Sequence, residues 1–511
     1  MAAVAEPSWR ARLRALVETR PFERLVVGVV VVNALTLGLE TSATATALAG
    51  PLLFALDRTI ARGSWPAALA SGLLAAVLLA GRDQVALLGA YLALGFVLAR
   101  WASGPDRLTT IRRSLGPLVL AAGLAALLAA PPLVLTALEA ARSNRLAIDL
   151  EGAGRGSLHP ALLLTLVTPH LFGSGGPMAE FWGPPSFAWP DTGLFVAQNM
   201  GVLYSGLLPL LLLAAAGRAL ARTPDGPFLL IALLLLLLYA LGWYAPLLAL
   251  AWEFVPGVQL FRRPADATFL LGLLLALLGA RAFDLLLARG IDRAALRRSI
   301  LLLAAGLVAA SLLALGRGRL ARAAPALGEA ALWFAAAASG LVLLARASPI
   351  RRPAWALGLV LLTALDLARN NGPNGATGLP VQGEVDWSVL EPSSPEPLLD
   401  RLAALARPRP EEGRRDRVEL VGLGYAWPNA PLVRGLEHTL GHNPVRWARY
   451  VVAVGAEDTV AVPDQRRFTP AFPSWRSPLA DLLGLRWIAT PVPIEELDPA
   501  LATDPLPLVA R

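Results

Sequence analysis

The stretch TFLLGLLLALLGARAFDLLL, which runs from Thr268 to Leu287, decides the class of fold to which this chain belongs. A helix needs about 20 apolar residues to cross the hydrocarbon core of a bilayer, and this stretch has that length. A longer run, PFLLIALLLLLLYALGWYAPLLALAW, starts at Pro227. Buried helices of soluble proteins seldom recur in this way without interrupting charges. The sequence therefore predicts an integral membrane protein with many spans.

Composition favours a membrane protein and excludes several other classes. Of the 511 residues, 56% are hydrophobic and only 16% are charged, against about 25% charged residues in soluble domains. The net charge of +8 comes from Arg, since the sequence contains no Lys. This charge is spread over many loops, so we expect no nucleic-acid partner. The absence of Cys excludes disulfides, thiol catalysis and Cys-ligated metals.

The apolar runs predict about ten transmembrane helices. They are expected at residues 22–39, 64–80, 84–100, 115–139, 201–217, 227–250, 267–289, 299–316, 329–346 and 354–369. Short Arg-rich turns between spans are expected in the cytoplasm under the positive-inside rule. The turn Gly81–Gln84, the loop 140–200 and the segment around Pro256 then face outward. One turn, Arg317–Arg322, carries three Arg and yet falls on the outer side.

The N-terminal region does not fit this alternation of sides. A crossing at 22–39 places Glu40 outside, whereas the span at 64–80 has to start inside. The stretch 47–60 would have to cross back, but Asp57 and Arg58 interrupt its apolar run. We therefore expect a missing or distorted crossing in this region.

The character of the chain changes after residue 370. Residues 381–511 alternate acids, Arg and Pro with short runs typical of β-strands, namely RVELVGL, ARYVVAVG and LRWIATPV. No run in this part reaches spanning length. The sequence predicts an extracytoplasmic soluble domain over 370–511, of α/β or mostly β structure.

From about residue 64 to the end, the chain resembles the YfhO-type bacterial membrane proteins, which are related to C-type glycosyltransferases. The stretches that carry the resemblance are, in order, LLAGRDQVALLGAYLAL, VTPHLFG, FWGP, LYSGLLPLLL, FVPGVQLFRRPADATFLLGL, ALDLARNNGPN and PLADLLGLRWIAT. Arg82 and Asp83 depart from the usual form of the first of these. The resemblance implies an all-α polytopic domain over 64–369 in the bacterial inner (plasma) membrane. It also implies membrane lipid as a partner, and transfer of a sugar from a polyprenyl-phosphate donor to a cell-envelope acceptor.

The first 60 residues resemble a different family. RPFERLVVGVVVVNALTLGLETS, followed by LLFALDRTI, is similar to the start of a voltage-sensor domain of a cation channel. No span with Arg at every third position follows, and neither does a pore loop. The two resemblances meet near residue 60, which suggests a chimeric reading frame. C-type glycosyltransferases usually carry their catalytic acid in the first outer loop, which the channel-like segment replaces, and Glu40 is the only acid left there.

Arg262 and Arg263 are the strongest candidates for ligand binding. Their short connection is expected at the outer membrane interface, and paired guanidinium groups suit a lipid phosphate or diphosphate. The alternative is that they anchor the chain at the interface or pair with Asp266 or Glu253.

Glu180 and Asp191 are the candidate catalytic carboxylates. They lie in the loop 140–200 with His170, Trp182 and Trp189, and carboxylates beside aromatic rings suit sugar binding. The alternative is a folded loop whose Trp side chains rest at the headgroup level.

No cofactor is predicted, although a divalent metal ion is compatible with sugar transfer. The four His residues show no metal-ligand spacing. Two functions remain open at this point. One is a transferase of the C-type class that uses lipid-linked sugars, in active or degenerate form. The other is a non-catalytic membrane protein, or an ion-transport-domain fragment without a pore.

Overall fold

The computed structural model of this chain is mostly helical and divides into two compact units. It describes residues 43–81, 83–104, 106–143, 149–176, 180–184, 186, 189, 193–194, 202–290, 292–372, 387–406, 416–442, 446–456, 460 and 462–509. One unit, here the helical unit, comprises Met1–Leu133 and Ile148–Thr377. The other, here the C-terminal unit, comprises Val134–Ala147 and Gly378–Arg511. The domain boundary predicted from the sequence, at residue 370, lies near the division between Thr377 and Gly378.

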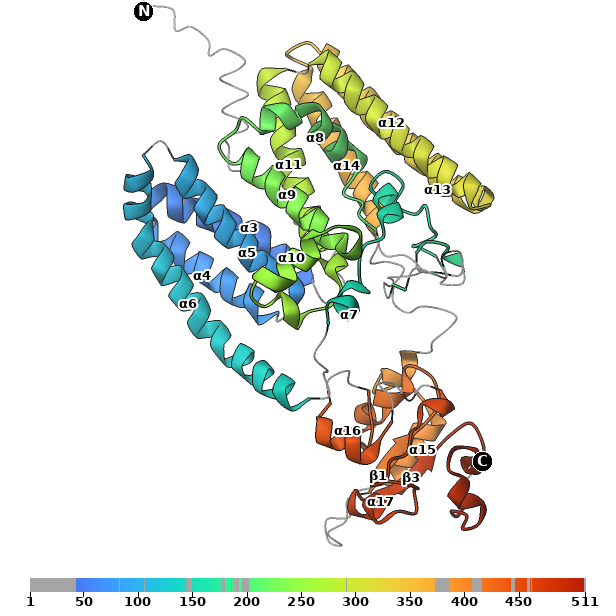
Figure 1. Cartoon of the computed structure of the whole chain (residues 1–511). Helices are drawn as coiled ribbons and strands as arrows, with labels where there is room; N and C mark the ends of the chain where they lie inside the picture. Colours follow the sequence, from blue (N-terminus) through green and yellow to red (C-terminus); the bar gives the residue numbers. More distant parts are fainter. Residues whose placement is uncertain are drawn as a thin grey trace, which may run out of the picture. The chain divides into compact units, whose positions relative to one another are not determined.

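Long helices build the helical unit (Figure 1). They are α3 (Ala43–Arg62), α4 (Trp65–Ala80), α5 (Gln84–Ser103), α6 (Arg107–Arg142), α8 (Leu207–Leu220), α9 (Gly226–Ala240), α10 (Leu247–Phe254), α11 (Thr268–Arg289), α12 (Arg293–Gly316), α13 (Leu320–Arg346) and α14 (Arg352–Asn371). Among the described residues, five helices are long and apolar enough to cross a membrane: α5, α6, α11 with its preceding turn, α12 and α13. Shorter apolar helices are α4, α8 and α9.

Every predicted span from residue 64 onward overlaps a helix, whereas the predicted span 22–39 lies outside the described residues. The predicted single span 227–250 is two helices. After α9 ends, Gly242 takes a positive φ of 52° and α10 begins behind Pro246. Because Gly tolerates this backbone and Pro lacks an N–H, the apolar run turns here without losing its hydropathy.

Helix α3 runs without a break through the stretch where charges interrupt the apolar run. The carboxylate of Asp57 pairs with Arg100 of α5 at 2.9 Å, and Arg58 lies over the ring of Phe54. The helix packs against α4 and α5. The interruption read from the sequence is therefore a paired charge inside a continuous helix.

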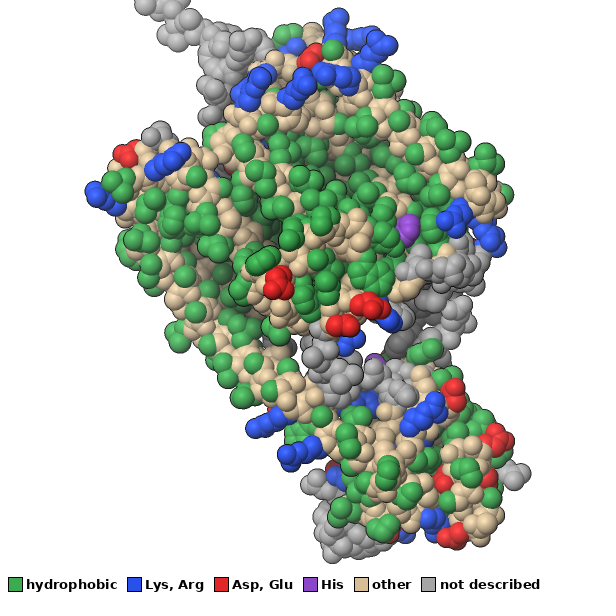
Figure 2. Space-filling model, in the orientation of Figure 1, with side chains coloured by type: hydrophobic (Ala, Val, Ile, Leu, Met, Phe, Trp, Pro, Cys, Tyr) green, Lys and Arg blue, Asp and Glu red, His purple; other side chains and the backbone are tan. Residues whose placement is uncertain are grey.

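Basic side chains gather at one end of the helical unit. At this end Arg113 donates to the carbonyl of Ile60, and Arg281 pairs with Asp225 at 2.7 Å. Basic side chains gather where α11 ends and α12 begins (Figure 2). The segments predicted to face outward meet at the opposite end, which holds the site described below.

The C-terminal unit combines a small parallel sheet with short helices. The strands β1 (Arg417–Leu420), β2 (Glu437–His438) and β3 (Leu485–Ala489) pair in the order β2-β1-β3. The helices are α15 (Pro397–Leu405), α16 (Ala448–Val454), α17 (Pro478–Leu482) and α18 (Ile494–Leu497), and the 3-10 helices are η7 (Trp387–Leu390), η9 (Trp427–Arg434), η10 (Pro463–Gln465) and η11 (Pro499–Ala502).

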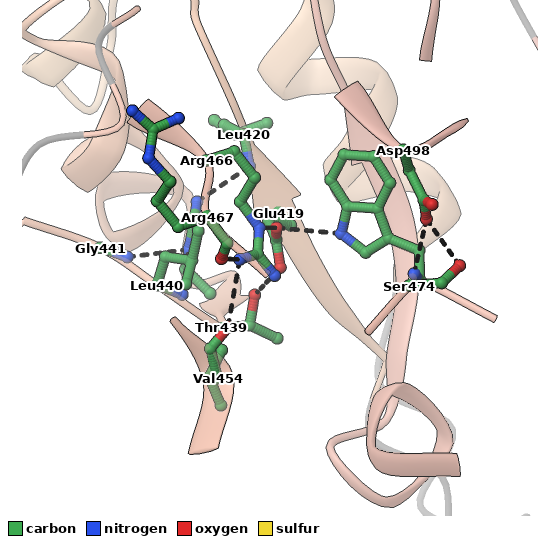
Figure 3. A network of polar contacts seen from close by, with 12 residues as sticks. Glu419, Leu420, Thr439, Leu440, Gly441, Val454, Arg466, Arg467, Ser474 and Asp498 are labelled. Carbon is green, nitrogen blue, oxygen red and sulfur yellow. Dashed lines mark hydrogen bonds and ion pairs between the residues drawn. The ribbon is translucent and has the colours of Figure 1, made fainter. Parts of the chain in front are cut away.

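A fully buried ion pair holds this unit together (Figure 3). Glu419 of β1 and Arg466 lie 2.7 Å apart with no side-chain exposure. Thr439 and the indole of Trp475 also donate to the carboxylate of Glu419, at 2.7 and 3.0 Å. The guanidinium of Arg466 donates to the carbonyl of Val454 at 3.1 Å. A buried charge is tolerated only when it is paired and hydrogen-bonded in this way.

Candidate functional site

An irregular segment between α10 and α11 carries the two arginines singled out by sequence. The 3-10 helices η5 (Val258–Leu260) and η6 (Pro264–Ala267) flank Arg262 and Arg263. Arg263 itself has a φ of 63°, which is uncommon for a residue with a side chain. Backbone of this kind is stable only where surrounding contacts fix it.

Gln84, the first residue of α5, supplies part of that support. Its side chain is 3% exposed. With the amide oriented to match its neighbours, it accepts from the hydroxyl of Tyr239 and donates to the carbonyl oxygens of Arg262 and Arg263. The preceding Asp83 caps α5 by accepting from the backbone of Ala86 at 2.7 Å. The first residues of α5 therefore fix the backbone of the arginine segment.

A second support comes from the segment 149–156, which contains the short helix α7 (Leu150–Gly154). The N–H of Arg263 donates to the carbonyl of Ala153 at 3.2 Å, and the N–H of Ala265 donates to that of Gly156 at 3.1 Å. A Cβ at Gly156 would overlap the backbone of Arg263. Gly156 is therefore required for the close approach of these two segments.

These segments line an open cavity of about 630 Å³, a volume within the usual range for small-ligand sites. Its lining residues are Asp149, Glu151, Gly152, Arg155, Gly156, Arg262 and Arg263. Three guanidinium groups and two carboxylates thus share one cavity. All of them belong to the helical unit.

The charges of the cavity are partly paired with one another. Arg155 lies 3.5 Å from Glu151, and Arg263 lies 3.7 Å from Asp266. The carboxylate of Asp149 accepts from the backbone N–H of Gly152 at 2.7 Å, so it caps α7. Half-exposed guanidinium groups on a rigid backbone can bind an anionic group such as a phosphate through charge-assisted hydrogen bonds.

The predicted carboxylates do not line this cavity. Glu180 is exposed and lies against the turn at Gly173 and Gly176. Asp191 lies outside the described residues. Trp182, which was expected beside them, is 1% exposed and packs edge-on against Phe172. This Trp is a core side chain and offers no face to a sugar.

Another polar cluster of the loop 140–200 surrounds His159. Its ring packs edge-on against Trp189 and Tyr244, at 4.9 and 5.0 Å between centroids. Burial, and then the nearby Arg317, lower the pKa of His159. The guanidinium of Arg317 lies 3.6 Å from the centre of the Trp189 ring. A cation–π contact therefore holds the basic turn 317–322 against the loop 140–200, on the same side of the unit.

Asp366 of α14 forms a third cluster, which is buried. It accepts from the hydroxyl of Tyr204 at 2.6 Å, from the N–H of Leu207 at 3.2 Å and from the amide of Asn370 at 2.8 Å. The motif ALDLARNN thus ties α14 to the start of α8. His170 lies nearby, and burial lowers its pKa. Because Asp366 makes these hydrogen bonds, we infer that it positions α14 against the start of α8.

Within the described residues, no group of three or more His, Asp or Glu side chains could hold a metal ion. The residues that sequence reasoning missed are Gln84, Glu151, Arg155 and Gly156. The run DLEGAGRGS around the last three of these offers a signal, because glycines between an acid and an Arg mark a tight, polar turn.

The comparisons with known proteins give no further guide to the site. No protein family, curated protein or solved structure matches this chain.

Proposed function

We propose that this protein binds a polyprenyl-phosphate sugar and transfers the sugar to an acceptor of the bacterial cell envelope. The observation that carries the proposal is the cavity in which Arg262 and Arg263 meet Arg155. In this proposal the guanidinium groups bind the lipid phosphate and stabilise the charge that remains on it when the sugar departs. The resemblance to YfhO-type and C-type glycosyltransferases supports the same class of substrate.

Glu151 is the carboxylate that the cavity itself offers for removing a proton from the acceptor hydroxyl. It lines the cavity, whereas Glu180 does not. The other carboxylate in the cavity, Asp149, already accepts a backbone hydrogen bond as a helix cap. We therefore assign proton transfer to Glu151 in preference to the residues favoured by the sequence.

The proposal places the chain in the bacterial plasma membrane, with the cavity and the C-terminal unit outside the cytoplasm. It has the roughly ten spans expected by sequence, as in a C-type glycosyltransferase. Helix α3 is an additional crossing, from outside to inside, which restores the alternation of sides. Its pairing between Asp57 and Arg100 supports this, because the C-terminal end of α3 then lies beside the Arg-rich end of α5.

The direct test is binding of a polyprenyl-phosphate sugar to the full chain in nanodiscs. Each charge-assisted hydrogen bond contributes roughly 1.5–3 kcal/mol, so the double variant Arg262→Gln, Arg263→Gln, which removes two of them, should bind about a hundred- to ten-thousandfold more weakly. The matched control is Arg297→Gln, Arg298→Gln, an exposed adjacent pair on α12. This control should bind like the wild type. Equal affinity in the first variant and the wild type would rule out the phosphate role.

A second variant separates binding from transfer. Glu151→Gln should retain donor binding and lose transfer of a radiolabelled sugar from the donor to the acceptors present in bacterial envelope membranes. Full sugar transfer by this variant would remove Glu151 from the mechanism. Donor binding by the wild type with no transfer to these membranes would favour a non-catalytic or degenerate protein.

A further inference from the structure

The C-terminal unit has an exposed apolar surface made by two helices. The last turns of α6 contribute Val134, Leu135 and Leu138, and α16 contributes Trp447 and Val452. Trp447 is 65% exposed and Val452 is 75% exposed. All five residues belong to the same compact unit. We refer to them as the α6–α16 surface.

Specific contacts hold the two helices together. The indole of Trp447 donates to the carboxylate of Glu139 at 3.1 Å. Trp447 also forms an antiparallel bridge with Ser143. On its inner side α16 is fixed by the buried Val454 and by Tyr450, whose hydroxyl donates to the carbonyl of Thr439. The outward positions of Trp447 and Val452 are therefore set by the core of the unit.

The length of α6 connects this surface to the membrane. The helix has 36 residues and is about 54 Å long, well beyond the hydrocarbon core of about 30 Å. Exposed apolar side chains continue along it from Leu127 and Leu128 to Leu135 and Leu138. Figure 2 shows hydrophobic side chains along α6 and basic side chains near its C-terminal end. Helix α6 itself therefore continues beyond a membrane-spanning length into Val134, Leu135 and Leu138 of this surface.

The rim of the surface has the chemistry of a bilayer interface. Exposed Arg142 and Arg449 lie at the ends of the two helices beside Trp447. A Trp ring favours the headgroup level, and Arg side chains reach from an apolar surface to lipid phosphates. Anionic headgroups also attract such a basic rim.

We propose that the α6–α16 surface lies in the headgroup region of the bilayer that α6 crosses. In this proposal α16 contacts the membrane, and lipid covers the α6–α16 surface. This assignment is independent of the proposed sugar transfer.

The absence of native Cys makes a direct test feasible in the full chain. A spin label is attached to Val452→Cys, and the control label to Leu482→Cys. Leu482 is also an exposed apolar residue of this unit, 81% exposed, but it lies on α17. Figure 1 shows α17 below α16 in this unit. The protein is reconstituted into vesicles of phosphatidylglycerol and phosphatidylethanolamine.

Collision of each label with oxygen, which concentrates in lipid, is compared with collision with a water-soluble nickel chelate. The ratio of oxygen to nickel collisions should be several-fold higher at position 452 than at position 482. Equal ratios would overturn the proposal. Shielding of the label at 452 from both reagents, with spin–spin broadening between labels, would overturn it in favour of a second copy of the chain. Because both side chains are exposed, neither substitution should disturb folding.

Discussion

At the scale of single residues, Gln84 connects parts of the chain that lie far apart in sequence. It contacts Tyr239, 155 residues away, and the carbonyls of the two arginines. Replacing it by Leu leaves buried polar groups without partners, each at a cost of about 1–3 kcal/mol. Gln84→Leu should therefore lower the thermal unfolding midpoint of the detergent-solubilised protein and weaken donor binding.

The matched control for this prediction is Gln259→Leu. Gln259 is exposed and donates to the carbonyl of Trp252 at 2.8 Å. Removal of an exposed hydrogen bond should change stability by less than about 0.5 kcal/mol. The same loss of stability in both variants would contradict the role assigned to Gln84.

His438 makes the C-terminal unit sensitive to acid. One ring nitrogen faces the N–H of Leu420 at 3.0 Å, and the other faces those of Leu440 and Gly441 at 2.8 and 3.0 Å. A protonated ring could accept at neither nitrogen. Burial lowers the pKa of His438 from 6.5 to about 4.

The sign of this pH effect follows from proton binding. Between pH about 4 and about 6.5 the unfolded chain binds the proton and the folded chain does not. Stability is therefore complete above pH about 6.5 and is lost as the pH falls toward about 4, by about 3 kcal/mol. Hydrogen exchange of the C-terminal unit, corrected for intrinsic rates, should show this loss. His438→Gln, which cannot titrate, should reduce the slope; an unchanged slope would assign the effect elsewhere.

At the scale of elements, the ion pair between Glu419 and Arg466 joins strand β1 to the segment that follows η10. Removal of one member of a buried pair leaves the other charge uncompensated, which costs about 3–5 kcal/mol. Arg466→Met should therefore strongly destabilise the C-terminal unit, as measured by its protease resistance in the full chain.

The control for this variant is the exposed pair of Arg476 and Asp504, 3.2 Å apart. Surface pairs contribute about 0–1 kcal/mol, so Arg476→Met should leave protease resistance nearly unchanged. Equal sensitivity of both variants would contradict the distinction drawn between the two pairs.

At the scale of the whole molecule, topology can be read by labelling single Cys variants in intact cells with a membrane-impermeant maleimide. Gln259→Cys, near the cavity, and Leu482→Cys, in the C-terminal unit, should react from outside. Arg222→Cys, at the Arg-rich end, should react only after permeabilisation. Protection of Leu482→Cys in intact cells would place the C-terminal unit in the cytoplasm.

The sequence by itself determined the helical character of the chain and the positions of most of its helices. Hydropathy is local, so the run from Thr268 to Leu287 predicts α11, which covers Thr268–Arg289. The neighbouring Pro256, Gly257 and Pro264 also predicted that the adjacent Arg262 and Arg263 lie at a break between helices. Local patterns were sufficient because chain length and polarity decide which segments can lie in a bilayer.

Only the tertiary structure decided which residues share a site. Gln84 of α5 and the segment that carries Glu151 each contact the segment around Arg263, and no local pattern records that packing. The same reason explains why the sequence predicted a missing or distorted crossing where α3 is a continuous helix, since Asp57 pairs with Arg100 of another helix. It also explains the turn within 227–250, where the contact of Leu158 with the carbonyl of Ala240 fixes the end of α9. Contacts between distant segments depend on shape and on hydrogen-bond partners in three dimensions, and hydropathy along the chain does not contain them.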